Sequence, residues 1–425
     1  MEEIILSNGL RMLYCQIVDA YSTSIGLYVK CGSRYEDISN NGVTHFLEHI
    51  HFRRLGSLSQ DEIYYKTESM GSTLRACTYK DFLRFYMKTH PKHFLDCLMI
   101  FKEILASTLW TKEDVELERK VILNELYEKS TYVNIESVVA KAVWGNNPLS
   151  LPIIGNEDSI KSLTLQSIVD YKNIAFQKER ILLVITGCIS ERNMAKAKEM
   201  LEKVTLATEG PKALVCVSPK PRYVERKPDV CFSNCNWSIV DVCISFDVDI
   251  DFVQTEELAI LNSILGGGYG SILQRSIREK KCLSSNVYSY FDFYEDAAVL
   301  HISFSIEKKN VYDGISGIMI LLQGLKKRIS ERDFLATMPF FTNNLRFLPE
   351  DPMTMNFELG WQSFVRNREF LSVEEQIVQY EKVSIKRLVE ISNSIFKPEN
   401  TVITILGSTN KLTKKEIRRI VQDGL

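Results

Sequence analysis

Short runs of β-branched and aromatic residues alternate along the chain with longer stretches in which apolar positions recur at helical spacing. The short runs predict strands and the longer stretches predict amphipathic helices, a pattern typical of folds that mix helices with a sheet. Thr111 and Asp114 form a capping-box-like pair at the start of one such helix. In the first half, strands are predicted over 24–30, 83–88 and 181–186, and helices over 42–52, 92–107, 112–128 and 191–203.

The second half of the chain repeats this pattern. The run 181–187 has a counterpart at 401–407, an offset of 220 residues. The strands at 24–30 and 83–88 have counterparts near 239–246 and 299–304, at offsets of 215 and 216. Similar offsets at three places indicate two copies of one domain, each of about 210 residues. The predicted fold class is α+β (α/β): two homologous domains, each a β-sheet covered by helices, related by a pseudo-two-fold repeat.

A cluster of prolines separates the two copies. Four of the eleven prolines of the chain lie between Thr205 and Phe232, at Pro211, Pro219, Pro221 and Pro228. Proline disfavours helix both at its own position and at the residue before it, so this stretch is expected to be extended. We predict domains over 1–210 and 236–425, joined by a Pro-rich linker over 211–235.

Composition and charge exclude several classes of partner. Lysine and arginine number 52 against 54 acidic residues, a net charge of −2, so the chain has no basic surface typical of nucleic-acid binding. No apolar run approaches the length that crosses a bilayer, and the first residues lack the features of a secretory signal. The ten cysteines are scattered and form no disulfide framework. The expected location is the cytoplasm, without membrane insertion.

Three of the six histidines are clustered at His45, His49 and His51. Residues four apart share one face of a helix, so His45 and His49 can present both imidazoles to one metal ion. Glu48 lies about 60° round the helix from His45, close enough to hold a water on that ion. The pattern predicts a metal site in the first copy, since Asn262 occupies the position of His45 in the second. The alternative is a helix with half-buried, hydrogen-bonded histidines.

A catalytic zinc takes three protein ligands and leaves one position to water, so a third ligand is required. Glu118 and Glu125 share one face of the predicted helix over 112–128, beside an apolar stretch. A carboxylate in such a stretch is costly unless it is paired or bound to a cation. A solvated charged face is the alternative, and it fits Glu116 better than Glu125. The helix offers four candidates: Glu116, Glu118, Glu125 and Glu128.

The spacing His45-x-x-Glu48-His49, followed by Glu118-x6-Glu125, resembles the inverted zinc motif of the pitrilysin and insulin-degrading-enzyme family, the inverzincins. The length resembles that of the short two-domain branch, which includes mitochondrial processing peptidase subunits. The resemblance implies that His45, His49 and Glu125 bind Zn2+, that Glu48 is the general base and that Glu118 is a supporting acidic residue at the catalytic site. Further segments also resemble the family: Leu6-Ser-Asn-Gly-Leu-Arg-Met, Asn147-Pro-Leu-Ser-Leu-Pro-Ile-Ile-Gly155 and Leu265-Gly-Gly-Gly-Tyr-Gly.

Two features depart from the family pattern. Arg278 matches a substrate-binding arginine of the second domain, but Ser285 stands where the family has the tyrosine that steadies the oxyanion, and Cys282 replaces a glycine. Arg75-Ala76 stands where the family has Asn-Ala on the substrate-binding edge strand. Since a serine hydroxyl is too short to replace a phenol, the hypothesis is that a homologous subunit supplies the Arg/Tyr pair in a heterodimer.

The resemblance therefore predicts a zinc-dependent endopeptidase that cleaves short unfolded peptides, for example precursor or leader peptides, as the metal-bearing subunit of a heterodimer. Arg75, Ala76 and Arg278 are the expected substrate-binding residues. One alternative is a non-catalytic zinc-binding scaffold subunit of a processing complex, although a scaffold gains nothing from an open metal site. Another is a metal-binding regulator, which would bind zinc without turnover.

Overall fold

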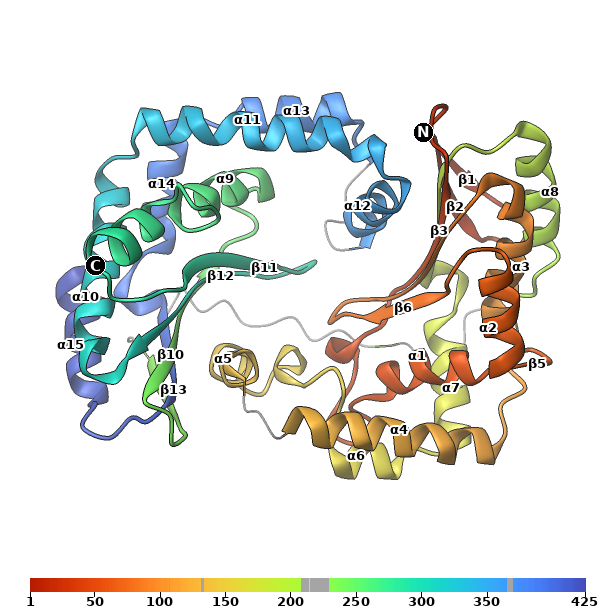
Figure 1. Ribbon diagram of the computed structural model, residues 1–425, viewed down its shortest axis with the longest axis horizontal. Coiled ribbons are helices and arrows are strands. Elements are labelled where there is room, and N and C mark those ends of the chain that lie inside the picture. Colours follow the sequence, from red (N-terminus) through yellow and green to blue (C-terminus); the bar gives the residue numbers. More distant parts are fainter. Residues whose placement is uncertain (107, 131–133, 208–213, 215–228, 365–369) are drawn as a thin grey trace. The chain divides into compact units, whose positions relative to one another are not determined.

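The computed structural model describes residues 1–425 except 107, 131–133, 208–213, 215–228 and 365–369. The chain forms two compact units, each built around one sheet (Figure 1). The first unit comprises Met1–Tyr132, Asn147–Val217 and Phe347–Ser372. The second comprises Val133–Asn146, Ser218–Arg346 and Val373–Leu425.

The sheet of the first unit has six strands in the order β1-β2-β8-β3-β7-β6. Neighbouring strands are antiparallel except β2 and β8, which are parallel. All seven residues of β3 and of β8 are buried, as expected for central strands covered on both faces. The strands are β1 (Glu2–Ile5), β2 (Arg11–Gln16), β3 (Thr23–Val29), β6 (Arg75–Thr78), β7 (Leu83–Thr89) and β8 (Ile181–Gly187).

Helices from the first half of the chain cover one face of this sheet. Ile25, Leu27 and Val29 of β3 point into their common hydrophobic core. A short hairpin of β4 (Arg54–Leu55) and β5 (Leu58–Ser59) turns the chain between α1 and α2. The helices are α1 (Val43–Arg53), α2 (Gln60–Ser69), α3 (Phe94–Leu105), α4 (Lys112–Ser130), α6 (Glu157–Ser162), α7 (Leu165–Ala175) and α8 (Glu191–Glu202).

The opposite face of the same sheet is covered by α12 (Pro352–Phe364), which comes from the second half of the chain. The Tyr28 hydroxyl on β3 lies 2.9 Å from the carbonyl oxygen of Asn356, to which it donates. A Cβ at Gly26 would come within 2.2 Å of the Asn356 amide oxygen, so the close approach of α12 requires glycine there.

The second unit repeats this plan with a five-stranded sheet in the order β11-β12-β10-β13-β9. Its second face is covered by α5 (Ile135–Trp144), which comes from the first half of the chain. The strands are β9 (Asp229–Asn234), β10 (Ile239–Val248), β11 (Val287–Phe293), β12 (Ala298–Glu307) and β13 (Thr401–Gly407). The helices are α9 (Thr255–Leu265), the π-helical segment η5 (Gln274–Lys280), α10 (Val311–Lys327), α11 (Glu331–Phe347), α13 (Val373–Glu381), α14 (Ile385–Ile395) and α15 (Lys414–Gly424).

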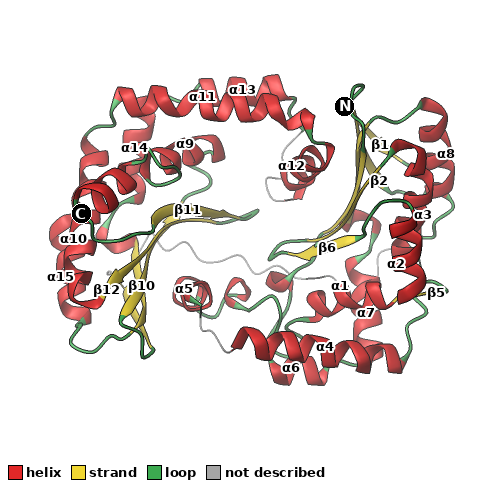
Figure 2. Cartoon of the chain, viewed as in Figure 1, coloured by secondary structure: helices red, strands yellow, loops and turns green. Residues whose placement is uncertain are grey.

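The mixed helix-and-sheet fold with two sheet-centred domains confirms the predicted class, and Figure 2 shows helices packed on each sheet. Every strand and helix predicted in the first half is present, with ends shifted by one or two residues. The units differ from the contiguous ranges 1–210 and 236–425, because α5 and α12 each pack on the sheet of the other half. Among the described helices, none has the length and apolarity needed to cross a membrane.

The predicted linker over 211–235 is too long at its C-terminal end. Asp229–Asn234 form β9, which pairs in parallel with β13 and places Val230 in the core. The ladder hydrogen bonds to β13 and the burial of Val230 outweigh the proline signal upstream. The four prolines themselves lie outside the described residues.

Helix α7 of the first unit carries a buried lysine, Lys172. The side chain of Lys172 on α7 is 4% exposed, and its amine donates to the carbonyl oxygen of Ala106 at 2.7 Å. The same amine lies over the rings of Trp110 and Phe176. Removal from water disfavours the charged form and lowers the pKa of Lys172 to about 7.

We expect Lys172→Met to raise the free energy of unfolding at pH 7 by about 2–4 kcal/mol, because an unfolded lysine titrates near 10.4 and its protonation opposes folding below that pH. Lys172 should contribute a rise in stability between about pH 7 and 10.4, where the unfolded state holds its proton and the folded state has lost it. Denaturant unfolding across this range measures the slope. The slope should be smaller in Lys172→Met and unchanged in Lys196→Met, which removes an exposed lysine of α8.

Candidate metal centre

Helix α1 carries the histidine pair, and a buried carboxylate fixes where it begins. Glu36 accepts hydrogen bonds from the backbone N–H groups of Gly42 at 2.7 Å and Thr44 at 2.9 Å. These N–H groups have no hydrogen-bond partner within the helix, so Glu36 supplies the missing acceptor at the N-terminus of α1. Phe46, Leu47 and Ile50 are buried in the core, which leaves His45, Glu48 and His49 on the side facing α4 and β6.

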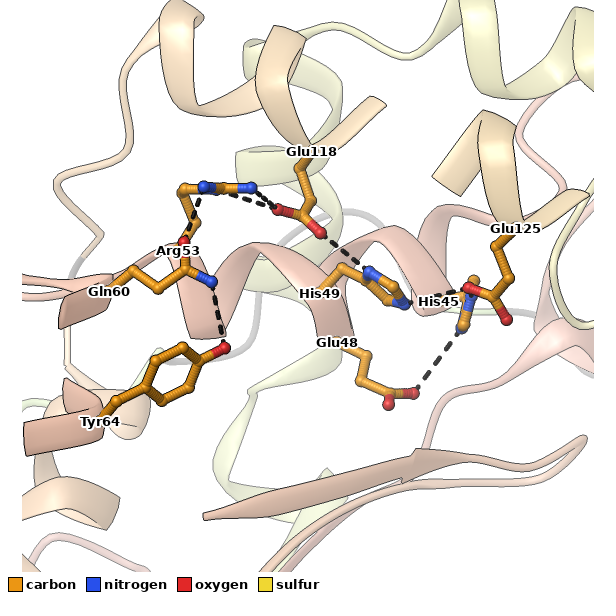
Figure 3. A network of polar contacts seen from close by, with 8 residues as sticks. All are labelled: His45, Glu48, His49, Arg53, Gln60, Tyr64, Glu118 and Glu125. Atoms are coloured by element: carbon orange, nitrogen blue, oxygen red, sulfur yellow. Dashed lines mark hydrogen bonds and ion pairs between the residues drawn. The ribbon is translucent and has the colours of Figure 1, made fainter. Parts of the chain in front are cut away.

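Helix α4 brings the acidic residues to this side of α1. Its start is capped as predicted, because Asp114 accepts the backbone N–H of Thr111 and Thr111 accepts the N–H of Asp114. Ile122 is buried and holds the helix on the core. The seven-residue spacing then places Glu118 and Glu125 beside the histidines of α1 (Figure 3).

Three side chains converge with the separations of a metal site. The Nε2 atoms of His45 and His49 lie 3.3 Å and 3.5 Å from one carboxylate oxygen of Glu125. Ligands of a tetrahedral zinc with bonds near 2.0–2.1 Å are about 3.3 Å apart. Among the described residues, these three are the one group of His, Cys, Asp or Glu whose candidate ligand atoms all lie within 4.8 Å of one another. The donor set therefore fits zinc.

Glu118 lies behind the histidine pair and orients one of its rings. It accepts a hydrogen bond of 2.9 Å from Nδ1 of His49, which leaves Nε2 with a lone pair for a metal. Burial would raise the pKa of Glu118, but hydrogen bonds from His49 and Arg53 outweigh it and lower this pKa. Glu118 is therefore ionised at neutral pH, and it acts through His49.

His45 is strongly basic while no metal is bound. Burial would lower the pKa of His45, but hydrogen bonds to Glu125 and Glu48 raise it to about 9. A metal ion needs the neutral imidazole, so ion and proton compete for this ring. Metal binding at neutral pH should therefore release a proton.

Glu48 lies next to the three candidate metal ligands and accepts a hydrogen bond from a residue of the edge strand. Its Oε2 atom is 3.8 Å from Nδ1 of His45 and accepts a hydrogen bond of 2.5 Å from the Thr78 hydroxyl on β6. Burial would raise the pKa of Glu48, but bonds from His45 and Thr78 outweigh it and lower the pKa. The carboxylate is therefore ionised at neutral pH. Thr78 was not predicted from the sequence, although it lies two residues after Ala76 and so on the same face of the strand, which was an available signal.

A cavity of about 340 Å³ opens beside Glu48 and His49 within the first unit. Its volume is large enough for an amino-acid side chain, and apolar and polar groups share its wall. The lining residues are Glu48, His49, Phe52, Arg53, Gln60, Tyr64, Glu118 and Val121.

The predicted substrate-binding residues lie in both units. Arg75 and Ala76 belong to β6, the last strand of the first sheet, where Arg75 is exposed. Arg278 belongs to η5 of the second unit, with its guanidinium 3.4 Å from the side-chain oxygen of Gln274. Ser285 is exposed in the loop before β11. Cys282 has a positive φ of 51°, a conformation that favours glycine and is strained for other residues.

Comparisons with known proteins agree with this architecture. A 302-residue match to the "Uncharacterized zinc protease YmxG" of Bacillus subtilis is 26% identical and covers 69% of this chain and 71% of the relative. A 419-residue match to the "Mitochondrial-processing peptidase subunit beta" of Rattus norvegicus is 23% identical and covers 96% of this chain and 84% of the relative. A Pseudomonas fluorescens structure described as "peptidase M16 inactive domain" superposes with a TM-score of 0.85 at 17% identity, covering 96% of this chain and 98% of the other.

Two family models match consecutive parts of the chain. The model described as "Insulinase (Peptidase family M16)" matches residues 11–157, which include the histidine pair and Glu125. The model described as "Peptidase M16 inactive domain" matches residues 162–338. Together they span most of the chain, and with the shared fold they show that it belongs to peptidase family M16, the insulinase family.

Proposed function

We propose that the protein is a zinc-dependent endopeptidase of short unfolded peptides. The observation that carries this proposal is the convergence of His45 Nε2 and His49 Nε2 on one oxygen of Glu125, with the ionised Glu48 beside them. Zinc held by these three residues would acidify a bound water and polarise a carbonyl. Glu48 would then accept the proton of that water and pass it to the departing amine.

The edge strand β6 is the proposed binding site for the peptide backbone. An extended peptide can add to a sheet edge by main-chain hydrogen bonds, here next to Arg75 and Ala76. The Thr78 hydroxyl joins this strand to Glu48, so a peptide paired with β6 would lie close to the proposed base. The exposed guanidinium of Arg75 favours peptides with an acidic residue at the facing position.

We further propose that the chain works as the metal-bearing half of a heterodimer. Ser285 cannot replace the tyrosine that the family resemblance leads one to expect, and removing one oxyanion donor lowers turnover by about 10²–10³-fold. A homologous subunit with an intact Arg/Tyr pair would restore this donor. The name of the rat relative, a subunit of a peptidase, fits such an arrangement.

The decisive experiment measures zinc content and peptide cleavage by the purified chain, alone and mixed with a homologous protein encoded beside it. We expect about one zinc per chain, with cleavage in the mixture at least about 100-fold faster than by the chain alone. Full-speed cleavage by the chain alone would contradict the heterodimer. Bound zinc without cleavage in either sample would favour the scaffold or the regulator over the peptidase.

A further inference from the structure

A continuous chain of hydrogen bonds leads from the three candidate metal ligands to the wall of the cavity. It starts at His49, passes through Glu118, Arg53 and Gln60, and ends at Tyr64 (Figure 3). Each link joins two side chains, and the chain connects three helices, α1, α4 and α2. The family resemblance assigned roles to His49 and Glu118 in this set, but none to Arg53, Gln60 or Tyr64.

Arg53 determines how the Glu118 carboxylate is turned. Its Nε and Nη2 atoms donate to Oε2 of Glu118 at 3.0 Å and 2.8 Å. This leaves the other oxygen, Oε1, directed at Nδ1 of His49 at 2.9 Å. The carboxylate is 8% exposed, so these charge-assisted bonds are poorly screened by solvent. Without Arg53, Glu118 would lose the bonds that fix its rotation.

Gln60 fixes Arg53 in turn. Its side-chain oxygen accepts from Nη1 of Arg53 at 2.7 Å, and its side-chain nitrogen donates to the Tyr64 hydroxyl at 3.0 Å. The two contacts need opposite ends of the amide, so they select one orientation of Gln60. Because Arg53, Gln60 and Tyr64 all line the cavity, contact with a bound side chain acts on the same bonds that orient His49.

We propose that Arg53 is a positioning residue of the metal centre, and that Gln60 and Tyr64 extend its action to the cavity wall. Arg53 fixes the rotation of the Glu118 carboxylate. Glu118 then accepts a hydrogen bond from the proton on Nδ1 of His49, so that the lone pair of Nε2 is available to the metal. This inference rests on the metal site of the proposed function and not on peptidase activity. Loss of an outer-shell partner of a metal-binding histidine lowers metal affinity by about 10–100-fold.

The neighbouring Arg54 provides a matched control. Its Nε lies 2.9 Å from Oδ2 of Asp114, so it also forms an ion pair with α4, and that carboxylate is likewise 8% exposed. Neither Arg54 nor Asp114 belongs to the chain of bonds that runs from His49 to Tyr64. Arg54→Met and Arg53→Met therefore remove similar contacts to α4, but only Arg53→Met removes the hydrogen bonds that fix the rotation of Glu118.

The experiment measures zinc affinity of the full chain by competition with a chromophoric chelator. We expect Arg53→Met to weaken zinc binding by about 10–100-fold and Arg54→Met to change it by less than about twofold. Arg53→Lys should fall between Arg53→Met and the native protein, because an ammonium cannot form the two-pronged contact. Gln60→Leu should have a smaller effect than Arg53→Met, and Tyr64→Phe the smallest.

A second readout does not require metal. The 15N shifts of the His49 ring in the zinc-free chain report which nitrogen carries the proton. We expect Nδ1 to be protonated in the native protein and in Arg54→Met, and a mixture of tautomers in Arg53→Met. Equal losses of zinc affinity in Arg53→Met and Arg54→Met, or an unchanged His49 tautomer in Arg53→Met, would overturn the proposal. Tight zinc binding without peptidase activity would contradict the proposed function but leave this inference intact.

Discussion

Replacing Glu48 by glutamine is expected to lower kcat for peptide cleavage by about 10²–10⁴-fold, the contribution typical of a positioned general base. Glutamine keeps the size of the side chain and can still accept from the Thr78 hydroxyl, so the local packing should survive. It cannot take up a proton, so the attacking water would lose its base. Cleavage of a peptide library followed by mass spectrometry measures the loss, in the presence of the partner subunit.

The control for this variant is Glu113→Gln, which removes an exposed carboxylate from α4 at the same cost in charge. Zinc content should equal that of the native protein in both variants, because Glu48 is not among the three converging ligands. A Glu48→Gln variant that cleaves at the native rate would show that another group acts as the base.

Replacing Glu125 by glutamine is expected to lower zinc affinity on the order of 10³-fold. The zinc-binding free energy of small structural sites is about 10–16 kcal/mol, and one of three protein ligands accounts for roughly a third of it. The amide oxygen carries no negative charge to offset that of the ion. Zinc competition assays measure the loss, and peptidase activity should fall with zinc occupancy.

The same variant has a signature in the zinc-free protein. Glu125 is a cause of the raised pKa of His45, so Glu125→Gln should move that pKa down from about 9 toward the ordinary value. In the native protein, the stability that His45 contributes is present at low pH and is lost as pH rises through about 9. NMR titration of the His45 ring tests this. Glu113→Gln should leave both zinc affinity and the His45 titration unchanged.

Much of the site could be predicted because it is local in sequence. His45, Glu48 and His49 lie within five residues of one helix, and helical periodicity alone puts both imidazoles on one face. The choice between Glu118 and Glu125 was different. Periodicity placed both on one face of α4, and only the family resemblance separated their roles. The structure shows why they differ: Glu125 meets the Nε2 atoms, whereas Glu118 meets Nδ1 of His49.

The residues that support the site could not be predicted in this way. The sequence shows Arg53, Gln60 and Thr78 as ordinary polar positions, because each acquires its role from a partner on another element. Tyr64 joins the set only through Gln60, which is on the same helix. Thr78 is 30 residues from Glu48, and Arg53 is 65 residues from Glu118. Such contacts depend on how α1, α2, α4 and β6 pack, which no local pattern specifies.

The sequence by itself determined three strands of each sheet, four helices of the first half, the repetition of the pattern and the histidine pair, because periodicity, capping and burial of apolar residues act over short stretches. Tertiary structure decided which sheet each helix covers. An amphipathic pattern shows that α5 and α12 need an apolar face to pack against, but it does not specify which sheet provides that face. Helix α12 covers the first sheet because Asn356 meets Tyr28 and the bare backbone at Gly26, a match of shape and hydrogen bonds that exists only once the chain is folded.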